Sequence, residues 1–495
     1  MVVQQTEKSI DPKTGRPRPQ QTFMISTMGQ AGRGAFAINI GGNELVSGNP
    51  IGVDNMGSSD WYNDIFLFQT PTGKDNYLGF TIGTPAIARL RVNEDQGASA
   101  TSVANHIREA AFINNGYNYS DTLASNNAGH LSSESALYIY DILGMDVGTD
   151  GFQKTGDKKG ELIAKLAPEQ DPDSDEKNGG LSSPTVLDID GDGVADIVYA
   201  GDYGGNLYRF DLRSPNPSQW TVHKIFSAGA PITSAPGVIL VEDPNNNGNN
   251  NSKNPTVIVT FGTGSDVYQS DLSNKDQQAV YGIYDNLNNT SPTEVSKNNL
   301  LKQELTASGE YRMLSDNKFD PKIHRGWYFN LEKGTGERVV SKPIVISYTG
   351  VVFSRAYDVK KDNKLEDPCK VTERKQESDV YSGKIQYNIK TGGRLKEGDP
   401  HIVFDPNVPF GAALTVKGLY GLDLSNSGTI KGLDIGTNGT QGSLILDPNR
   451  KIEECSRAPI FGVDTNGNTV NINVPRCPIK FKRLSWKEVK NSYLD

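Results

Sequence analysis

The chain repeats one pattern along most of its length, and this repetition limits the folds that it can adopt. The pattern begins with a small residue and a proline before an apolar strand, and ends with a strand of the type G-x-LY-x-x-D before turn-forming residues. The opening strands are TPAIARLRV (84–92), SPTVLDID (183–190), SAPGVILVE (234–242) and SKPIVIS (341–347). The closing strands are GRGAFAINI (32–40), SALYIYDI (135–142), GNLYRFDL (205–212), SDVYQSDL (265–272), SGKIQYNI (382–389) and GLYGLDL (418–424).

Repeated short antiparallel sheets predict an all-β fold of the β-propeller type. The closing strands alternate apolar and polar residues or carry aromatic side chains, as half-buried strands do. Roughly six copies recur at irregular spacings of about 50–90 residues, and radial repetition lets neighbouring blades share their cores. A chain of 495 residues is long enough for one such domain. A pair of β-sandwiches is the alternative.

We expect a flexible tail over residues 1–22 and a single propeller domain over residues 23–495, interrupted by three polar insertions. The insertions are PEQDPDSDEKNGG (168–180), DPNNNGNNNSKN (243–254) and DVKKDNKLEDPCKVTERKQESD (358–379). Their composition cannot bury much apolar surface, so each is predicted to be a solvated loop. Propellers also carry recognition in such loops.

Charge and hydropathy exclude some classes of protein. The net charge of −9 argues against a nucleic-acid binder, which carries a concentrated basic face. No stretch approaches the roughly 18–20 apolar residues of a membrane-spanning helix. The start, MVVQQTEKSIDPKTGRPRPQQ, lacks the apolar core of a secretory signal. The chain is therefore either cytoplasmic or the ordered part of a longer exported protein.

The three cysteines allow a disulfide but do not require one. Cys455 and Cys477 flank a predicted hairpin with its turn at Asn466 and Gly467. A disulfide closing a loop of that size would contribute about 3 kcal/mol. Two buried thiols are the alternative, and Cys369, in a charged loop, could pair with either of the other two.

The stretch DIDGDGVAD (188–196) has the spacing of a metal-binding loop. Alternate residues of a tight loop direct their oxygen atoms toward a common centre, and Gly193 permits the sharp turn that this requires. Ca²⁺ takes 6–8 hard oxygen ligands at about 2.3–2.6 Å. The predicted calcium ligands are the side chains of Asp188, Asp190, Asp192 and Asp196 and the backbone carbonyl of Val194.

Other readings of this loop fit less well. Tyr199 stands where an EF-hand has its closing glutamate, and the flanks read as strands, so this is a nine-residue calcium loop within a hairpin. Zn²⁺ and copper are poor matches because neither Cys nor His joins the cluster, and Mg²⁺ would keep more water molecules. The remaining alternative is an Asp- and Gly-rich turn without metal, although clustered carboxylates repel one another without a cation.

A catalytic constellation is not evident, and we expect a protein that is not an enzyme and has no catalytic residues. The sequence has no G-x-S-x-G elbow, no P-loop and no H-E-x-x-H motif. A quinone-dependent dehydrogenase, whose blades share the closing-strand pattern, is the enzymatic alternative. Those enzymes use adjacent cysteines and a repeated tryptophan motif, whereas here the cysteines are far apart and the four tryptophans are not in register. The five histidines are scattered, at positions 106, 130, 223, 324 and 401.

Taken together, several phrases resemble the C-terminal β-propeller of the PilC/PilY family of type IV pilus-associated proteins. They cover most of residues 23–490, and their combination is more specific than any single motif. The phrases are NGGLSSPTVLDIDGDGVADIVYAGDYGGNLYRFDL (178–212), VIVTFGTGSDVYQSDL (257–272), QAVYGIYDN (278–286), GWYFNLEKGTGERVVSKPIV (326–345) and RLSWKEV (483–489).

The resemblance implies a modified seven-bladed propeller and a protein exported through the periplasm to the outer membrane, cell surface and pilus tip, with a signal preceding these residues. It implies a role in pilus biogenesis, twitching motility and adhesion, with minor or major pilins and a host-cell receptor as partners. Calcium in the 188–196 loop would influence the balance between pilus extension and retraction. A structural scaffold with constitutively bound calcium is the alternative. The Arg-Gly-Asp tripeptide, which some members use to bind integrins, is absent from this sequence.

Overall fold

The computed structural model describes most of the first 396 residues and a set of strands beyond them. The described ranges are 1–6, 17, 19–45, 48–51, 62, 65–72, 76–92, 106–117, 134–147, 153–154, 159–169, 179–244, 255–308, 311–359, 378–396, 412–414, 422–423, 429–430, 444–446, 457–463, 469–475 and 482–483. The central parts of the three predicted insertions and all three cysteines lie outside these ranges.

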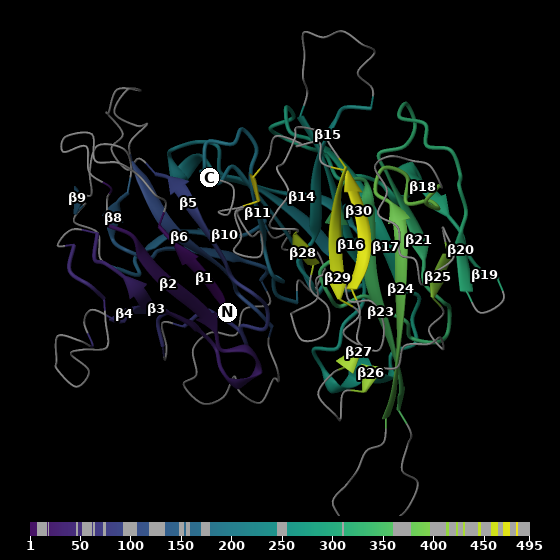
Figure 1. The fold of residues 1–495 in the computed structure, drawn as a ribbon, viewed down its shortest axis with the longest axis horizontal. Coiled ribbons are helices and arrows are strands. Elements are labelled where there is room, and N and C mark those ends of the chain that lie inside the picture. The colour runs from purple at the N-terminus through teal and green to yellow at the C-terminus, as the bar shows by residue number, and fades with distance from the viewer. Residues whose placement is uncertain are drawn as a thin grey trace, which may run out of the picture.

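Mainly antiparallel sheets follow one another along the chain (Figure 1), and the one parallel strand pair in the described residues joins β18 to β21 in the fourth sheet. The first sheet has the order β1 (Val2–Gln5), β2 (Gln21–Thr27), β3 (Ala35–Gly42) and β4 (Phe66–Gln69). The second has the order β10 (Leu162–Leu166), β7 (Leu137–Asp141), β6 (Ile107–Asn114) and β5 (Ala86–Arg91). The third has the order β14 (Thr221–Ser227), β13 (Asn206–Asp211), β12 (Ile197–Gly201), β11 (Thr185–Asp188) and β31 (Lys482–Arg483).

The second half of the chain continues this series. The fourth sheet has the order β15 (Gly237–Glu242), β16 (Pro255–Gly262), β17 (Ala279–Asn286), β21 (Gly326–Asn330) and β18 (Leu300–Gln303). Three-stranded sheets are formed by β22 (Ile344–Ile346), β23 (Thr349–Val359) and β24 (Ser378–Asn388), by β19 (Leu305–Ser308), β20 (Tyr311–Leu314) and β25 (Ala412–Leu414), and by β28 (Leu444–Leu446), β29 (Arg457–Val463) and β30 (Thr469–Pro475). Two strand pairs complete the set, β8 (Met145–Asp146) with β9 (Gln153–Lys154) and β26 (Leu422–Asp423) with β27 (Thr429–Ile430).

Among the described residues helical structure is short, and Tyr62 and Ile65 are α-helical. The 3₁₀ segments are η1 (Gly29–Ala31), η4 (Pro217–Gln219), η5 (Gln269–Ser273) and η6 (Lys297–Asn299). Within the described ranges, no helix has the length and apolar character needed to cross a bilayer.

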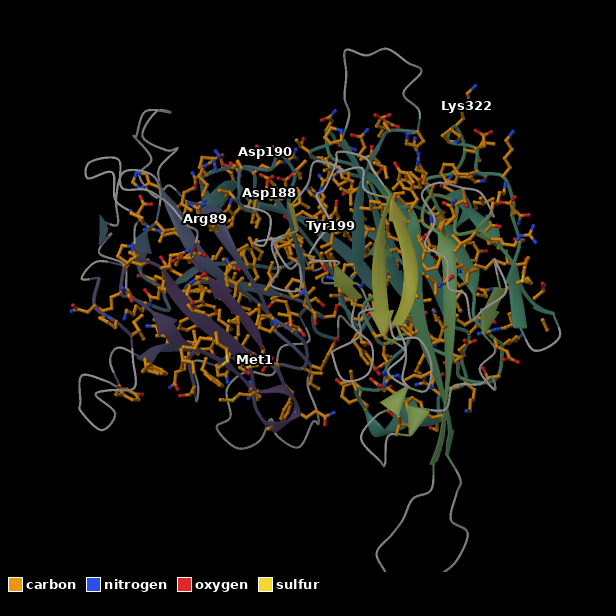
Figure 2. The ribbon with its side chains drawn as sticks, in the orientation of Figure 1. Met1, Arg89, Asp188, Asp190, Tyr199 and Lys322 are labelled. Atoms are coloured by element: carbon orange, nitrogen blue, oxygen red, sulfur yellow. The ribbon has the colours of Figure 1, made fainter. Side chains whose placement is uncertain are left out.

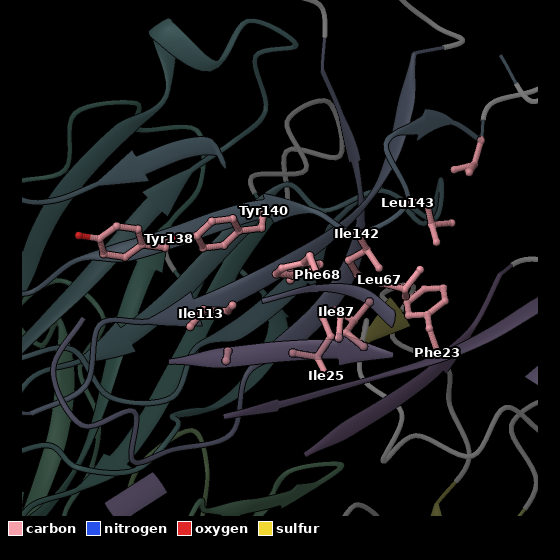
Figure 3. Close-up of a cluster of buried hydrophobic side chains, with 14 of the residues drawn as sticks. Phe23, Ile25, Leu67, Phe68, Ile87, Ile113, Tyr138, Tyr140, Ile142 and Leu143 are labelled. Atoms are coloured by element: carbon pink, nitrogen blue, oxygen red, sulfur yellow. The ribbon is translucent and has the colours of Figure 1, made fainter. Parts of the chain in front are cut away.

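The first four sheets and the β22–β24 sheet pack in series, and each neighbouring pair among them shares one apolar core. In the first core, Phe23 and Ile25 of β2 lie in one cluster with Ile113 of β6 and Tyr138 of β7 (Figure 3). A second core joins the second sheet to the third, a third joins the third to the fourth, and a fourth joins the fourth to β22–β24. Strands β6, β7 and β12 are buried at every position because both faces of their sheets are covered. Serial stacking of small sheets is how propeller blades share their cores.

The repeat pattern predicted most of these strands correctly. The four opening strands became β5, β11, β15 and β22, and four closing strands became β3, β7, β13 and β24. The closing segment 265–272 is an exception, because its second half enters η5. The Asp271 carboxylate accepts hydrogen bonds from the Tyr268 N–H and the Ser265 hydroxyl, which folds this segment into a turn. The next strand of that sheet is β17 instead.

The structure also tests two predictions for residues near the N- and C-termini. The prediction of a flexible tail over residues 1–22 was wrong for Val2–Gln5, which form β1 and pair antiparallel with β2. Val2 and Val3 are half-buried there, so apolar burial holds this short strand in place. The predicted hairpin near the C-terminus is confirmed by the pairing of β29 with β30, which runs from Arg457 opposite Pro475 to Val463 opposite Thr469. Its turn lies outside the described residues.

Candidate metal centre

The acidic stretch 188–196 forms the connection between two neighbouring strands of the third sheet. Strands β11 and β12 pair antiparallel, and the Asp196 N–H donates to the Leu187 carbonyl over 2.8 Å, which closes the hairpin. On its other edge β11 pairs with β31, so that Asp188 stands opposite Lys482. The chain end therefore reaches the strand that leads into the loop.

The backbone of the loop folds around the first carboxylate. Gly191 and Gly193 have φ angles of +83° and +87°, a region that glycine occupies without strain. These turns direct both N–H groups at Asp188, whose Oδ1 accepts from Gly191 over 2.7 Å and whose Oδ2 accepts from Gly193 over 2.8 Å. The Asp188 residue is fully buried. The glycines thus fix the orientation of the first predicted ligand.

Three of the predicted ligands converge. One carboxylate oxygen each from Asp188, Asp190 and Asp196 lies within 4.8 Å of the other two. Two oxygens bound to one Ca²⁺ at about 2.3–2.6 Å lie at most about 5 Å apart, so these three fit a single ion. The Ile189 N–H positions Asp196 by donating to its Oδ2 over 2.7 Å. Figure 2 shows Asp188 and Asp190 at one edge of the molecule.

The fourth aspartate points elsewhere. The Asp192 Oδ2 lies 2.6 Å from Nη2 of Arg91, which belongs to β5 of the neighbouring sheet. Its Oδ1 accepts from the Val194 N–H over 2.8 Å. The roles of Asp192 and of the Val194 carbonyl as calcium ligands therefore stay predictions.

Sequence reasoning missed the second sheet as a neighbour of the loop. Arg91 precedes Asp192 by 101 positions, so no local spacing connects them. The Ala195 N–H also donates to the Arg89 carbonyl over 2.8 Å, and Figure 2 labels Arg89 near Asp188. The one available signal was the repeat itself, since opening strands of successive blades are expected to lie side by side.

Burial raises the pKa of two carboxyl groups in the loop. For Asp188 burial is the largest cause, two backbone N–H groups of the loop counteract it, and the nearby carboxylates add to it. For Asp196 burial is again the largest cause, and together with the neighbouring carboxylates it raises the pKa to about 6, against the Ile189 hydrogen bond. Like charges held together at a partly buried site favour either protonation or a bound cation. The donor set is entirely oxygen, which suits Ca²⁺.

This shift predicts how the stability of the calcium-free protein depends on pH. The folded pKa of Asp196, about 6, lies above the ordinary pKa of 3.8 that its carboxyl group has in the unfolded chain. Below the unfolded pKa, Asp196 is protonated in both states and does not change the free energy of unfolding. As the pH rises from the unfolded pKa through the folded pKa, the free energy of unfolding falls, because the unfolded state releases its proton first. We expect the urea-unfolding free energy of wild type, relative to that of Asp196→Asn, to fall between pH 4 and pH 7 in calcium-free buffer. A constant difference would contradict the prediction.

Serially stacked antiparallel sheets that share their cores, with an acidic loop in one hairpin, define a β-propeller with a candidate calcium site. The family described as the PilY1 beta-propeller domain matches residues 11–318, and the chain belongs to this family. The all-β propeller expected from the repeats is thereby confirmed, and the number of blades stays an expectation.

Individual relatives agree with this assignment. The chain is 26% identical over 356 residues to a type IV pilus biogenesis factor PilY1 homolog of Xylella fastidiosa, covering 68% of this chain and 20% of that protein. It is 27% identical over 352 residues to the type IV pilus biogenesis factor PilY1 of Pseudomonas aeruginosa strain UCBPP-PA14, covering 65% of this chain and 25% of that protein. The chain thus spans a quarter or less of the length of these relatives.

A solved structure supports the fold independently. The Pseudomonas aeruginosa PilY1 C-terminal domain superposes with a TM-score of 0.56 at 20% identity, covering 94% of this chain and 82% of that domain. At this identity the likeness concerns the fold.

Proposed function

We propose that this chain is the calcium-binding propeller of an exported, pilus-associated protein that promotes type IV pilus biogenesis. The observation that carries the proposal is the convergence of Asp188, Asp190 and Asp196 within one hairpin of a PilY1-family propeller. The names of the relatives, type IV pilus biogenesis factors, support the cellular role. Pilins, and a receptor on the host cell, are the partners that we propose, with the outer membrane, cell surface and pilus tip as the site of action.

The ion would act by neutralising and bracing the loop. Asp188, Asp190 and Asp196 would hold it, and Asp192 and the Val194 carbonyl would complete the set. Bound calcium would supply positive charge to carboxylates that burial otherwise disfavours in their ionised form. Because the loop joins β11 to β12 and contacts β5, its rigidity would reach two neighbouring sheets.

Two versions of this function differ in calcium affinity. A site that is saturated below micromolar Ca²⁺ would be permanently occupied and would serve only as a structural brace. A site that fills within the range of environmental calcium would allow the ion to regulate pilus extension and retraction. Calorimetric titration of the calcium-stripped protein separates the two.

The regulatory version predicts a cellular phenotype for Asp196→Ala in the full-length protein. Surface pili, twitching motility and adhesion to host cells would each differ severalfold from wild type in calcium-containing medium, because the loop would lose a converging ligand. Pilus shearing assays, motility zones and adhesion counts measure these quantities. Glu304→Gln, which changes an exposed carboxylate paired with Lys302, is the control. Wild-type values for Asp196→Ala in all three assays would exclude the regulatory version.

A further inference from the structure

Arg91 of the second sheet pairs with Asp192, the predicted aspartate ligand that is not among the three converging carboxylates. Its Nη2 lies 2.6 Å from Oδ2 of Asp192, and the two side chains retain 37% and 33% of their exposure. The Arg91 Nε is buried without a hydrogen-bond partner among the residues that the structure describes. The guanidinium therefore binds Asp192 through one partly exposed contact and not in a bidentate arrangement.

Asp192 lies beside the converging carboxylates while it is paired with Arg91, so it is placed to exchange Arg91 for a bound ion. Its Oδ1 already accepts from the Val194 N–H over 2.8 Å, which keeps the carboxylate over the loop. The Asp192 N–H in turn donates to Oδ1 of Asp190 over 3.1 Å, so the backbone beside the cluster is already in place.

We propose that Arg91 competes with calcium for Asp192 and thereby sets the calcium affinity of the loop. In the metal-free protein Arg91 holds Asp192, and on calcium binding Asp192 leaves Arg91 and joins the other carboxylates. This inference rests on the proposed calcium site and adds an affinity-determining residue from a different sheet. Arg91 is a positioning residue here, since it acts on the ion through Asp192.

The balance of energies favours such an exchange. An exposed ion pair contributes little to stability, because water screens it and both side chains lose freedom. Calcium binds carboxylate oxygens, and the number of charged ligands tunes its affinity, so an additional carboxylate favours the bound ion. Every calcium that binds must nevertheless displace Arg91, so the arginine lowers the affinity without abolishing it. The backbone contact from Ala195 to Arg89 does not involve Asp192, so it can hold the two sheets together in both states.

The test is calorimetric calcium titration of the calcium-stripped chain and its variants. Arg91→Gln should bind Ca²⁺ roughly 1.5- to fivefold more tightly than wild type, because Asp192 then has no ion pair to give up. Arg91→Lys, which keeps the charge, should lie between the two. In an Asp192→Asn background the Arg91→Gln change should lose most of its effect. Lys165→Gln is the matched control, because Lys165 pairs with Glu134 at 2.6 Å with side-chain exposures of 38% and 23%.

The outcomes separate this inference from the proposed function. Calcium binding by wild type with equal or weaker binding by Arg91→Gln would overturn the competition and leave the calcium site standing. An equal gain in the Asp192→Asn background, or in Lys165→Gln, would also overturn it, because the effect would then be general electrostatics. No binding by wild type at millimolar Ca²⁺ would overturn the site itself. Circular dichroism of each variant establishes that it is folded.

Discussion

Replacing Asp188 with asparagine will remove the stabilisation of this protein by calcium while leaving the metal-free protein folded. In wild type, calcium at 100 times its dissociation constant should raise the free energy of unfolding by about 2.7 kcal/mol, since only the folded loop binds the ion. Asp188→Asn removes a fully buried carboxylate from the centre of the converging set. We expect its calcium affinity to fall by at least about 100-fold, which reduces that increment to about 0.4 kcal/mol or less at the same calcium concentration.

The metal-free comparison makes this prediction sharper. Burial raises the pKa of Asp188, so its ionised form is disfavoured in the folded protein at neutral pH. An asparagine side chain carries no charge and keeps one acceptor oxygen, but its NH2 group replaces the oxygen that accepts the other loop N–H. Asp188→Asn without calcium should therefore be less stable than wild type without calcium by at most about 1–3 kcal/mol, because removal of the buried charge offsets part of the lost hydrogen bond. Thermal melts with chelator and with millimolar Ca²⁺ measure both effects, and Glu304→Gln should respond to calcium as wild type does.

Two results would contradict the assignment of Asp188. Wild-type melting that is the same with and without calcium would remove the stabilising role of the ion. A full calcium response in Asp188→Asn would show that the ion binds elsewhere.

Neutralising Asp285 should destabilise the fold by about 3–5 kcal/mol, because it leaves a buried arginine without its main partner. The Arg209 side chain is fully buried in β13 of the third sheet, and its Nη1 lies 3.0 Å from Oδ1 of Asp285 in β17 of the fourth. The Tyr199 hydroxyl donates to the other oxygen of Asp285 over 2.6 Å. Asp285→Asn would leave Arg209 with the Asn289 carbonyl, which accepts from its Nη2 over 2.6 Å, and with the carboxylate of Asp211, 3.8 Å away.

This ion pair connects the sheet that carries the acidic loop to the next sheet. Its loss should therefore also destabilise β12, the strand of the acidic-loop hairpin that contains Tyr199. Urea unfolding measures the change in free energy. The control is Glu294→Gln, because the pair formed by Glu294 and Lys224 is partly exposed, at 3.5 Å, and should contribute at most about 1 kcal/mol. A loss below about 1 kcal/mol in Asp285→Asn would mean that Arg209 relaxes toward other acceptors.

Local patterns were sufficient for the elements of the fold. Alternation of apolar residues and proline-led openings predicted β5, β11, β15 and β22, because each strand's burial follows from its own residues. The segment 265–272 looked like a strand for the same reason, yet it forms η5. There Asp271 accepts two hydrogen bonds from nearby residues, and this local bonding outweighs a weak strand preference.

In the acidic loop too, some features follow from the local sequence and others from contacts between sheets. Alternate spacing and two turn-forming glycines are properties of nine consecutive residues, so the sequence alone was enough to predict a loop in which Asp188, Asp190 and Asp196 converge. The contact of Asp192 with Arg91 was decided by tertiary structure, because β5 reaches the loop only when two blades stack. The same holds for β31, which joins β11 from the far end of the chain. Spacing along a chain encodes what one turn brings together, whereas contacts between blades depend on the stacking of whole sheets.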